Sequence, residues 1–265
     1  FRSNGGVVAL PFADKTPAIL EAWLLGQAGG GGTADVLYGV VNPSGRLAET
    51  IPQRLADTPA YGNFPGEHGH VLYGEGLLVG YRWYDDRGLD VTYPFGHGLS
   101  YTTFAYGAAS TEIAESGDIV VTVPVTNTGA VAGREVVQAY TSLPGSSVQR
   151  PPHELKAFAS VPLEPGETKD VALTIRRSEL TYWDVRVDRW LLEGGEYVVE
   201  VGASSRDLRS RTTVSLDGDV VSLPISMESS FEELLVNAVV GAELQGVIDA
   251  KFGPESTLTT VRSQR

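Results

Sequence analysis

The fold is decided by four motifs that follow one another between residues 133 and 207. They read GREVVQAY at 133–140, RPPHELKAF at 150–158, LEPGET at 163–168 and GASSRD at 202–207. Short stretches of alternating apolar and polar residues are separated here by turns that contain proline or glycine, a pattern typical of a β-sandwich. We therefore expect an all-β domain in this part of the chain.

The same period of two extends on both sides of these motifs, from about residue 100 to residue 216. The clearest strands are predicted at 119–125, 136–140, 171–175 and 197–201, because valine, isoleucine and threonine dominate there. We place the β-sandwich at residues 100–220.

After Pro224 the pattern becomes helical, and residues 221–265 are predicted to form a helical tail. Ser229 or Ser230 is a suitable N-cap for its helix. The apolar residues expected on this helix are Phe231, Leu234, Leu235 and Val239. From Asp249 onward the sequence is polar, and we expect the chain to fray.

Residues 1–99 alternate between strand-like and helix-like stretches. The apolar run 7–10 predicts a buried parallel strand. Residues 18–23 carry a helical pattern, with Asp14 as a suitable N-cap. Four consecutive glycines at 29–32 lack the Gly-Lys-Ser/Thr ending and the Gly-x-Gly-x-x-Gly spacing of phosphate-binding loops, so they indicate a helix start where two backbones approach closely.

Residues 52–76 are rich in proline, glycine, tyrosine and histidine and show no periodicity. We predict one long loop, and loops of this length in compact domains are usually functional or disordered. The aromatic residues Tyr61, Phe64 and Tyr73 favour an ordered loop.

The composition excludes several classes of function. The chain has 265 residues, a formal net charge of −13 and no cysteine. An excess of acidic residues argues against nucleic-acid binding, and without cysteine there are no disulfides or thiolate chemistry. The sequence contains no run of about 18 apolar residues, so no membrane span is predicted. The lack of cysteine fits both the cytoplasm and many exported bacterial enzymes, with the cytoplasm slightly favoured.

Four further motifs occur before the sandwich. They read WLLGQ at 23–27, ADVLYGVVNPSGRL at 34–47, YGEGLLVGYRWYD at 73–85 and YPFGHGLSYTTF at 93–104. Together with the sandwich motifs, they resemble the C-terminal part of glycoside hydrolase family 3, of the β-glucosidase type, over roughly residues 7–210. One departure is Ala28, because the family commonly has glutamate after Gly-Gln.

The resemblance implies an α/β plus all-β fold. Residues 1–99 would form the second half of an α/β sandwich domain, followed by a fibronectin type III-like β-sandwich and the helical tail. Family members begin with a (β/α)-barrel and are mostly retaining, exo-acting β-glycosidases. Such enzymes use two carboxyl groups about 5 Å apart. In the family these are an Asp on the barrel and a Glu upstream of residues 7–10, so we expect this chain to lack both and to be inactive alone.

The expected partners are therefore a carbohydrate substrate, together with the barrel and the first half of the α/β sandwich. These parts belong to the same polypeptide or to a second chain, and no cofactor is expected. Because Phe1 is not an initiator methionine, it indicates either a processed N-terminus, as in a two-chain enzyme, or a shortened chain. An incomplete sheet would expose strand edges, so we expect the chain to be stable only when it is joined to the missing parts.

Two carboxylates within the chain are alternative catalytic candidates. Glu67 and Glu75 lie in or beside the aromatic loop, where they could instead anchor it through hydrogen bonds to backbone amides. Tyr61, Phe64 and Tyr73 could line the mouth of a sugar site or fill the joint between two domains. An alternative function is a non-catalytic module that binds carbohydrate or protein through the loop at 58–76.

The remaining candidates are interpreted as structural. His68 and His70 lack the spacing and the third ligand of a metal site, so no metal is expected. His97 lies between two glycines at the entry to the sandwich, where a hydrogen-bonded structural role is favoured. Tyr182, Trp183, Asp184 and Trp190 flank a predicted strand pair, and core packing is favoured there over ligand stacking.

Overall fold

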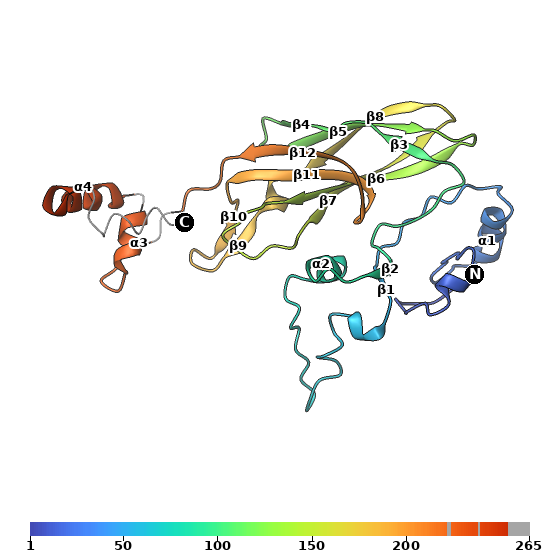
Figure 1. Ribbon diagram of the computed structural model, residues 1–265, viewed down its shortest axis with the longest axis horizontal. Helices are drawn as coiled ribbons and strands as arrows, with labels where there is room; N and C mark the ends of the chain where they lie inside the picture. Colours follow the sequence, from blue (N-terminus) through green and yellow to red (C-terminus); the bar gives the residue numbers. More distant parts are fainter. Residues whose placement is uncertain (222–223, 238, 254–265) are drawn as a thin grey trace. The chain divides into compact units, whose positions relative to one another are not determined.

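The computed structural model describes residues 1–221, 224–237 and 239–253 (Figure 1). Two compact units are present. The first comprises Phe1–Leu180 and Gly195–Leu216, and the second comprises Thr181–Gly194 and Asp217–Arg265. Within the described ranges, no helix has both the length and the apolar character needed to cross a membrane.

The predicted β-sandwich is confirmed in the first unit. One sheet has the strand order β12-β11-β6-β7, and in the other β5 pairs with β8 along one edge and with β3 and β4 along the opposite edge. All of these pairings are antiparallel. The strands are β3 (Phe104–Tyr106), β4 (Ser110–Ile113), β5 (Ile119–Asn127), β6 (Gly133–Ser142), β7 (Glu154–Leu163), β8 (Thr168–Ile175), β11 (Gly195–Ser204) and β12 (Asp207–Leu216).

The core of the sandwich follows directly from the period of two. Alternate residues of β5 are fully buried while their neighbours are half-buried, because successive side chains of a strand point to opposite faces. The four strands predicted most clearly lie in β5, β6, β8 and β11. These four include the central strands β5, β6 and β11 and the edge strand β8.

The strand β6 is buried on both faces, which a two-layer sandwich alone does not require. Val137 and Ala139 belong to the core, whereas Gln138 and Tyr140 point the other way and are equally inaccessible. Gln138 donates to the carbonyl of Gly96 at 3.2 Å, and the Tyr140 ring meets Tyr81 edge-on. A layer formed by residues 81–99 thus covers this sheet, and it contains α2 (Tyr81–Asp86) and β2 (Val91–Tyr93), which pairs with β1 (Ile51–Pro52) (Figure 1).

The first fifty residues contain little regular structure, and two predictions for them are wrong. Residues 7–10 form no strand, since none of the described residues lies in register to pair with them. Residues 18–23 are not helical, because this stretch pairs in parallel with Arg2 through a bridge to Glu21. A single 3-10 turn, η1 (Ala13–Lys15), takes the place of the helix start expected at Asp14.

The helix α1 (Gly29–Leu37) confirms the predicted glycine-lined helix start. Its glycines form the first turn, but a Cβ atom added at Gly30, Gly31 or Gly32 would meet no described atom within 4 Å. No residue of α1 is buried. A Cβ atom at Gly29 would lie 2.5 Å from Cβ of Leu25, so this glycine makes a close contact with a side chain, whereas the expected close approach of two backbones is not made by the described residues.

The second unit contains a two-stranded hairpin and two helices. The strands are β9 (Tyr182–Asp184) and β10 (Arg189–Leu191), and the helices are α3 (Phe231–Val236) and α4 (Gly241–Phe252). Ser230 caps α3 in a capping box with Glu233, as predicted. The single helix expected to reach Val239 is interrupted, because α3 ends at Val236 and Asn237 bonds to the amide of Val239 through its side chain.

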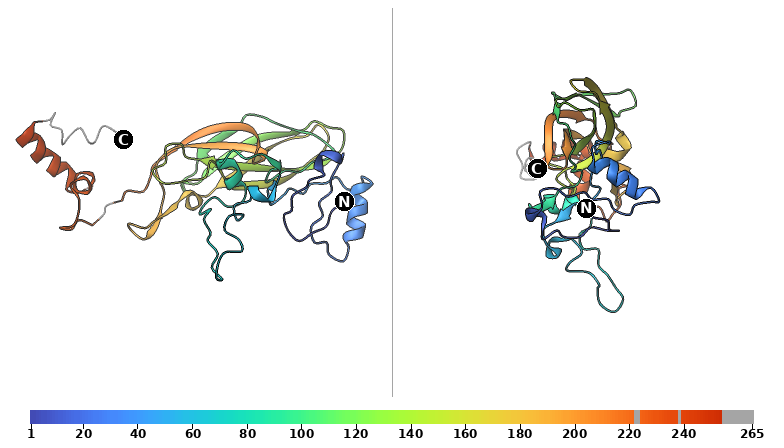
Figure 2. Two further views of the ribbon diagram at one scale, coloured as in Figure 1. Left: turned by 60° about the horizontal axis from the view of Figure 1, so that its bottom comes forward. Right: turned by 90° about the vertical axis from the view of Figure 1, so that its right-hand side faces the viewer.

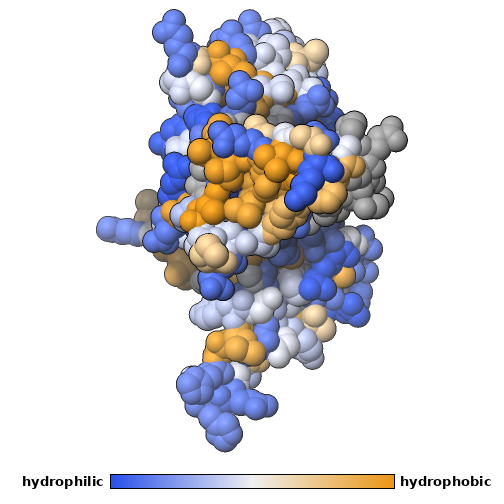
Figure 3. Space-filling model, turned by 90° about the vertical axis from the view of Figure 1, so that its left-hand side faces the viewer, coloured by the Kyte–Doolittle hydropathy of each residue, from blue (hydrophilic) through white to orange (hydrophobic). Residues whose placement is uncertain are grey.

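The tail does not begin to fray at Asp249, because α4 continues to Phe252; residues 254–265 lie outside the described ranges. Several apolar side chains of the tail are exposed, among them Phe231, Val239 and Val247. Figure 3 shows one face of the molecule, on which apolar side chains gather in a patch bordered by hydrophilic ones.

Candidate functional site

The predicted loop at 52–76, called the aromatic loop below, projects from the first unit (Figure 2). Its start is fixed by η2 (Leu55–Asp57), where Arg54 pairs with Asp57 at 2.6 Å and the indole N–H of Trp83 donates to the Asp57 carbonyl at 3.0 Å. Its end is fixed by Leu78, which is buried. The loop is therefore fixed at both ends, by residues other than the aromatic ones from which order was predicted.

The tip of the loop is a tight hairpin. The backbones of Glu67 and His70 exchange both hydrogen bonds, at 3.1 and 2.9 Å. His68 and Gly69, between them, both have positive φ, as the two-residue turns favoured in hairpins require. Gly66 allows this close approach, because a Cβ atom there would lie only 1.9 Å from the His70 carbonyl oxygen.

The three aromatic residues proposed for sugar contact are all on the surface of this loop. Tyr61 is 57% exposed, Phe64 71% and Tyr73 82%. None of the three makes a ring–ring contact with another described residue. They therefore fill no joint within the described part of the chain, and their ring faces are free to contact a ligand.

Glu67 and Glu75, the two candidate catalytic carboxylates, differ in exposure. Glu67 is exposed and Glu75 is half-buried. Neither carboxylate accepts a hydrogen bond from a described residue, so the loop is anchored by Leu78 and Trp83 instead.

The histidines of the loop, His68 and His70, are exposed, whereas His97 is half-buried. No group of three or more histidine, aspartate or glutamate side chains in the described ranges is arranged to hold a metal ion. His97 stacks on Tyr93 at 5.1 Å, and its backbone carbonyl accepts a hydrogen bond from Leu47 at 2.9 Å. Burial, aided by the positive charge of Arg46, lowers the pKa of the His97 imidazole below its usual range.

The helix α2 carries the end of the loop and is fastened to the sandwich by Asp85. One oxygen of the Asp85 carboxylate lies 3.1 Å from Nε2 of His153, and the other accepts from Nε of Arg206 at 2.8 Å. The Tyr81 ring stacks on His153, and its hydroxyl accepts a hydrogen bond from the Leu155 amide. The position of the loop therefore depends on contacts with β7 and with the β11–β12 turn.

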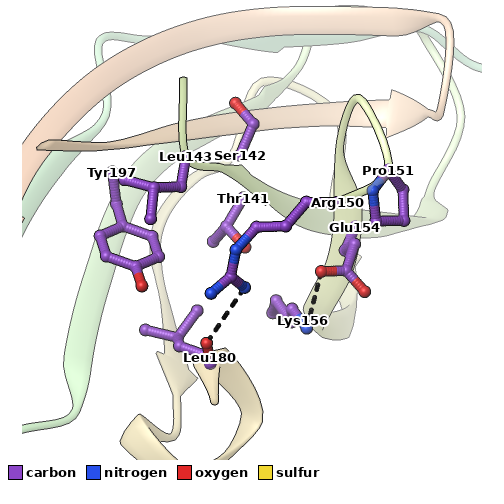
Figure 4. Close-up of a pocket in the computed structure, with 9 residues that line it drawn as sticks. All are labelled: Thr141, Ser142, Leu143, Arg150, Pro151, Glu154, Lys156, Leu180 and Tyr197. Atoms are coloured by element: carbon purple, nitrogen blue, oxygen red, sulfur yellow. Dashed lines mark hydrogen bonds and ion pairs between the residues drawn. The ribbon is translucent and has the colours of Figure 1, made fainter. Parts of the chain in front are cut away.

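A small hollow lies on the sandwich beside the segment between β6 and β7 (Figure 4). Arg150 donates to the carbonyl of Leu180, and Lys156 pairs with Glu154 at 3.3 Å and donates to the carbonyl of Glu179. Burial lowers the pKa of the Lys156 ammonium, although the Glu154 carboxylate opposes this shift. The enclosed space is about 10 Å³, enough for roughly one water molecule, so we interpret the cluster as structural.

Sequence reasoning missed two features. The fastening role of Asp85 has no local signal, because its partners lie 68 and 121 residues away in the chain. The interpretation of Trp183 and Trp190 as core residues is wrong: they are 45% and 62% exposed, although Tyr182 is half-buried and Asp184 is buried. The signal that could have been used is that Trp183 and Trp190 lie on the two strands of one predicted hairpin, opposite each other.

Comparison with protein families finds two matching domain models. Residues 2–101 match the glycosyl hydrolase family 3 C-terminal domain, and residues 135–205 match the fibronectin type III-like domain. The order of the two matches is the order that the motifs predicted.

Among curated proteins, the chain is similar to thermostable beta-glucosidase B of Acetivibrio thermocellus, with 44% identity over 255 residues. It is also 45% identical over 232 residues to an exo-alpha-(1->6)-L-arabinopyranosidase of Bifidobacterium longum. These matches cover 93% and 87% of this chain but 34% and 31% of the relatives. The chain thus spans about a third of the length of the curated relatives that it matches.

Solved structures agree. The family 3 β-glucosidase of Bifidobacterium adolescentis superposes with a TM-score of 0.85 at 46% identity, over 91% of this chain and 36% of that chain. A β-glucosidase from Streptomyces venezuelae in complex with D-glucose gives a TM-score of 0.77 at 39% identity, over 79% of this chain and 27% of that chain.

Proposed function

The chain belongs to glycoside hydrolase family 3, and we propose that it is the C-terminal scaffold of a retaining, exo-acting β-glycosidase that hydrolyses terminal β-linked sugars. Residues 1–99 would be the end of the α/β sandwich domain, residues 100–220 the fibronectin-like domain and residues 221–265 a tail. The nucleophile and the acid/base would come from parts outside this chain, in the same polypeptide or in a second one.

The observation that carries this proposal is the exposure of large apolar side chains before the sandwich. Around α1, Leu24 is 79% exposed, Tyr38 86% and Val40 74%. The helix α1 has no buried residue at all. Folded proteins rarely leave contiguous apolar surface in water unless it is an interaction site. We propose that the missing barrel and the first half of the α/β sandwich cover this surface.

The aromatic loop supports a role at the mouth of the sugar site. Its tip is held rigid by the hairpin at 67–70, and Tyr61, Phe64 and Tyr73 present their rings to solvent. Aromatic faces pack well on the C–H surfaces of sugars. These three residues would contact the substrate, while Glu67 and Glu75 would not take part in the chemistry.

The proposal is tested with the protein at its natural full length and an aryl β-glucoside as substrate. We expect hydrolysis with retention of anomeric configuration, observed by NMR of the first product. The Tyr73→Ala variant should raise KM several-fold with a smaller effect on kcat, and Glu67→Gln should leave kcat within about twofold. Inversion, no hydrolysis of any aryl β-glycoside, or a loss of kcat of about a hundredfold or more in Glu67→Gln would overturn it.

The alternative function is a non-catalytic module that binds carbohydrate or protein through the loop at 58–76. The exposed rings of that loop are equally compatible with this alternative. A full-length protein that binds sugar through the loop but hydrolyses nothing would favour it.

A further inference from the structure

The hairpin of β9 and β10 carries a pair of tryptophans on one face. The register places Trp183 directly opposite Trp190, and the two rings meet edge to face, with centroids 5.5 Å apart and planes 77° from parallel. Both side chains are exposed, whereas Asp184 and Leu191, on the opposite face of the same hairpin, are buried. The hairpin therefore has one covered face and one open face, and the tryptophans are on the open one.

This arrangement reverses the usual pattern. Where one face of an antiparallel pair is covered and the other meets water, polar residues are expected on the wet face. Here the wet face carries the two largest side chains available. A local break of this kind that has no structural compensation is typical of a functional site.

The covered face holds the hairpin rigid. The buried Asp184 carboxylate accepts hydrogen bonds from the Arg186 guanidinium at 2.5 to 3.2 Å and from the Tyr182 hydroxyl at 3.1 Å. These hydrogen bonds, with that from Arg186 the strongest, hold the pKa of Asp184 well below its usual range. Beyond β10, Leu192 and Asp219 exchange two hydrogen bonds of 2.8 Å, which fix the end of the hairpin. The tryptophans thus stand on a preorganised support.

We propose that Trp183 and Trp190 form a binding surface for β-linked gluco-oligosaccharides. A β-glucopyranose carries its substituents equatorially, so both faces of its ring present only C–H groups and can lie flat on an indole. Because the two indoles are nearly perpendicular, one would stack against a sugar ring while the other forms a wall at its edge. An α-linked chain curves, and consecutive rings would not lie flat on this surface.

Polar groups around the pair fit a sugar better than they fit a protein partner. Within the described ranges, neither indole N–H donates a hydrogen bond, so both are available to hydroxyl groups. The exposed residues of the turn that joins the two strands are Val185 and the charged Arg186 and Asp188, so the apolar surface beside the tryptophans is small. A stable protein interface would be expected to have a more continuous apolar centre. The choice of a glucan rests on the proposed function, whereas the stacking surface itself does not.

The test is a titration of the full-length protein with thio-linked cellotetraose, which glycosidases do not cleave. Binding is measured by calorimetry and by intrinsic tryptophan fluorescence. We expect the wild-type protein to show a class of sites that involves the two tryptophans. In Trp183→Ala and Trp190→Ala, the affinity of this class should fall about tenfold or more. Trp190→Phe should retain part of the affinity. Maltotetraose, with α-linkages, should bind this class at least several-fold more weakly.

Phe158→Ala is the matched control, because Phe158 is an aromatic residue that is 68% exposed on β7 and pairs with no other described aromatic ring. Identical isotherms for wild type and both alanine variants would overturn the proposal. Unchanged sugar binding together with a lower mass of the variants in light scattering would overturn it in favour of a protein interface. Hydrolysis of an aryl β-glucoside is measured separately, so failure of the proposed function and failure of this binding surface are distinguishable.

Discussion

Arg46 and Glu135 form a buried ion pair in which Nη2 lies 2.6 Å from Oε1. Arg46 ends the turn at 42–46, and its guanidinium also donates to the carbonyls of Ser44 and Gly45 at 3.2 and 3.1 Å. Glu135 lies at the start of β6, and its carboxylate accepts the Val136 amide at 2.7 Å. Through the turn at 42–46, the pair joins the layer before the sandwich to the sandwich itself.

Replacing Arg46 with alanine should destabilise the protein strongly. The Glu135 carboxylate would remain buried without its cation, and breaking a buried pair in this way costs about 3 to 5 kcal/mol. The free energy of unfolding, measured by urea denaturation, is the direct readout. The double variant Arg46→Met/Glu135→Met should recover much of the loss, because no buried charge is left unpaired. A loss of less than about 1 kcal/mol in the single variant would contradict the buried pair.

Asp85→Asn should loosen the attachment of α2 to the sandwich. It weakens the charged hydrogen bonds to His153 and Arg206, each worth about 1.5 to 3 kcal/mol when made to a charged group. We expect a lower midpoint of urea unfolding and faster amide hydrogen exchange in residues 81–89. Asp86→Asn is the control, since Asp86 is the exposed neighbour on the same helix. Equal behaviour of the two variants would show that Asp85 does not fasten the helix.

A side chain at Gly96 should destabilise the protein. Its φ is 79°, and a Cβ atom there would lie 2.2 Å from Oε1 of Gln138, which also accepts the Tyr140 hydroxyl. Gly145 has a nearly identical φ of 78° but open space around it. Gly145→Ala should therefore cost only the backbone strain, about 1 kcal/mol, whereas Gly96→Ala should cost about 1 to 3 kcal/mol more. Similar unfolding free energies for the two variants would contradict the close contact.

The sandwich could be predicted from the sequence because its information is local. In β5 every second residue is buried between two sheets that both lie within the chain, so the alternation of the sequence is the alternation of burial. The covering of Gln138 and Tyr140 by residues 81–99 could not be predicted in this way. A strand covered on both faces shows no alternation, and its second cover is distant in sequence.

The part before the sandwich was harder to predict for a different reason. Residues 7–10 have the composition of a buried strand, yet Val7 and Val8 are exposed here because no described strand pairs with them. Residues 18–23 have a helical sequence pattern, but their backbone forms hydrogen bonds with Arg2 instead of a helix. Residues 52–76 form a long loop, as predicted, but the exposure of Tyr61, Phe64 and Tyr73 depends on contacts that a sequence pattern does not encode.

His97 should make the protein less stable as the pH falls from about 7 towards 5. Its folded pKa is lowered, first by burial and then by Arg46, while Asp207 opposes the shift. The unfolded imidazole binds a proton near pH 6.5 and the folded one only at lower pH, so unfolding takes up a proton in this window. The loss is at most about 1.4 kcal/mol per pH unit.

The variant that tests this is His97→Phe, which keeps an aromatic ring against Tyr93 but cannot titrate. Unfolding free energies measured at pH 7 and pH 5 should differ less for this variant than for wild type. His68→Phe is the control, because His68 lies exposed in the hairpin at the tip of the loop. Since Arg209 also lowers the pKa of Asp207, the stability supplied by that carboxylate is lost only at more acidic pH, below about 4. An unchanged pH dependence in His97→Phe would therefore show that the His97 imidazole is not what destabilises the fold between pH 7 and pH 5.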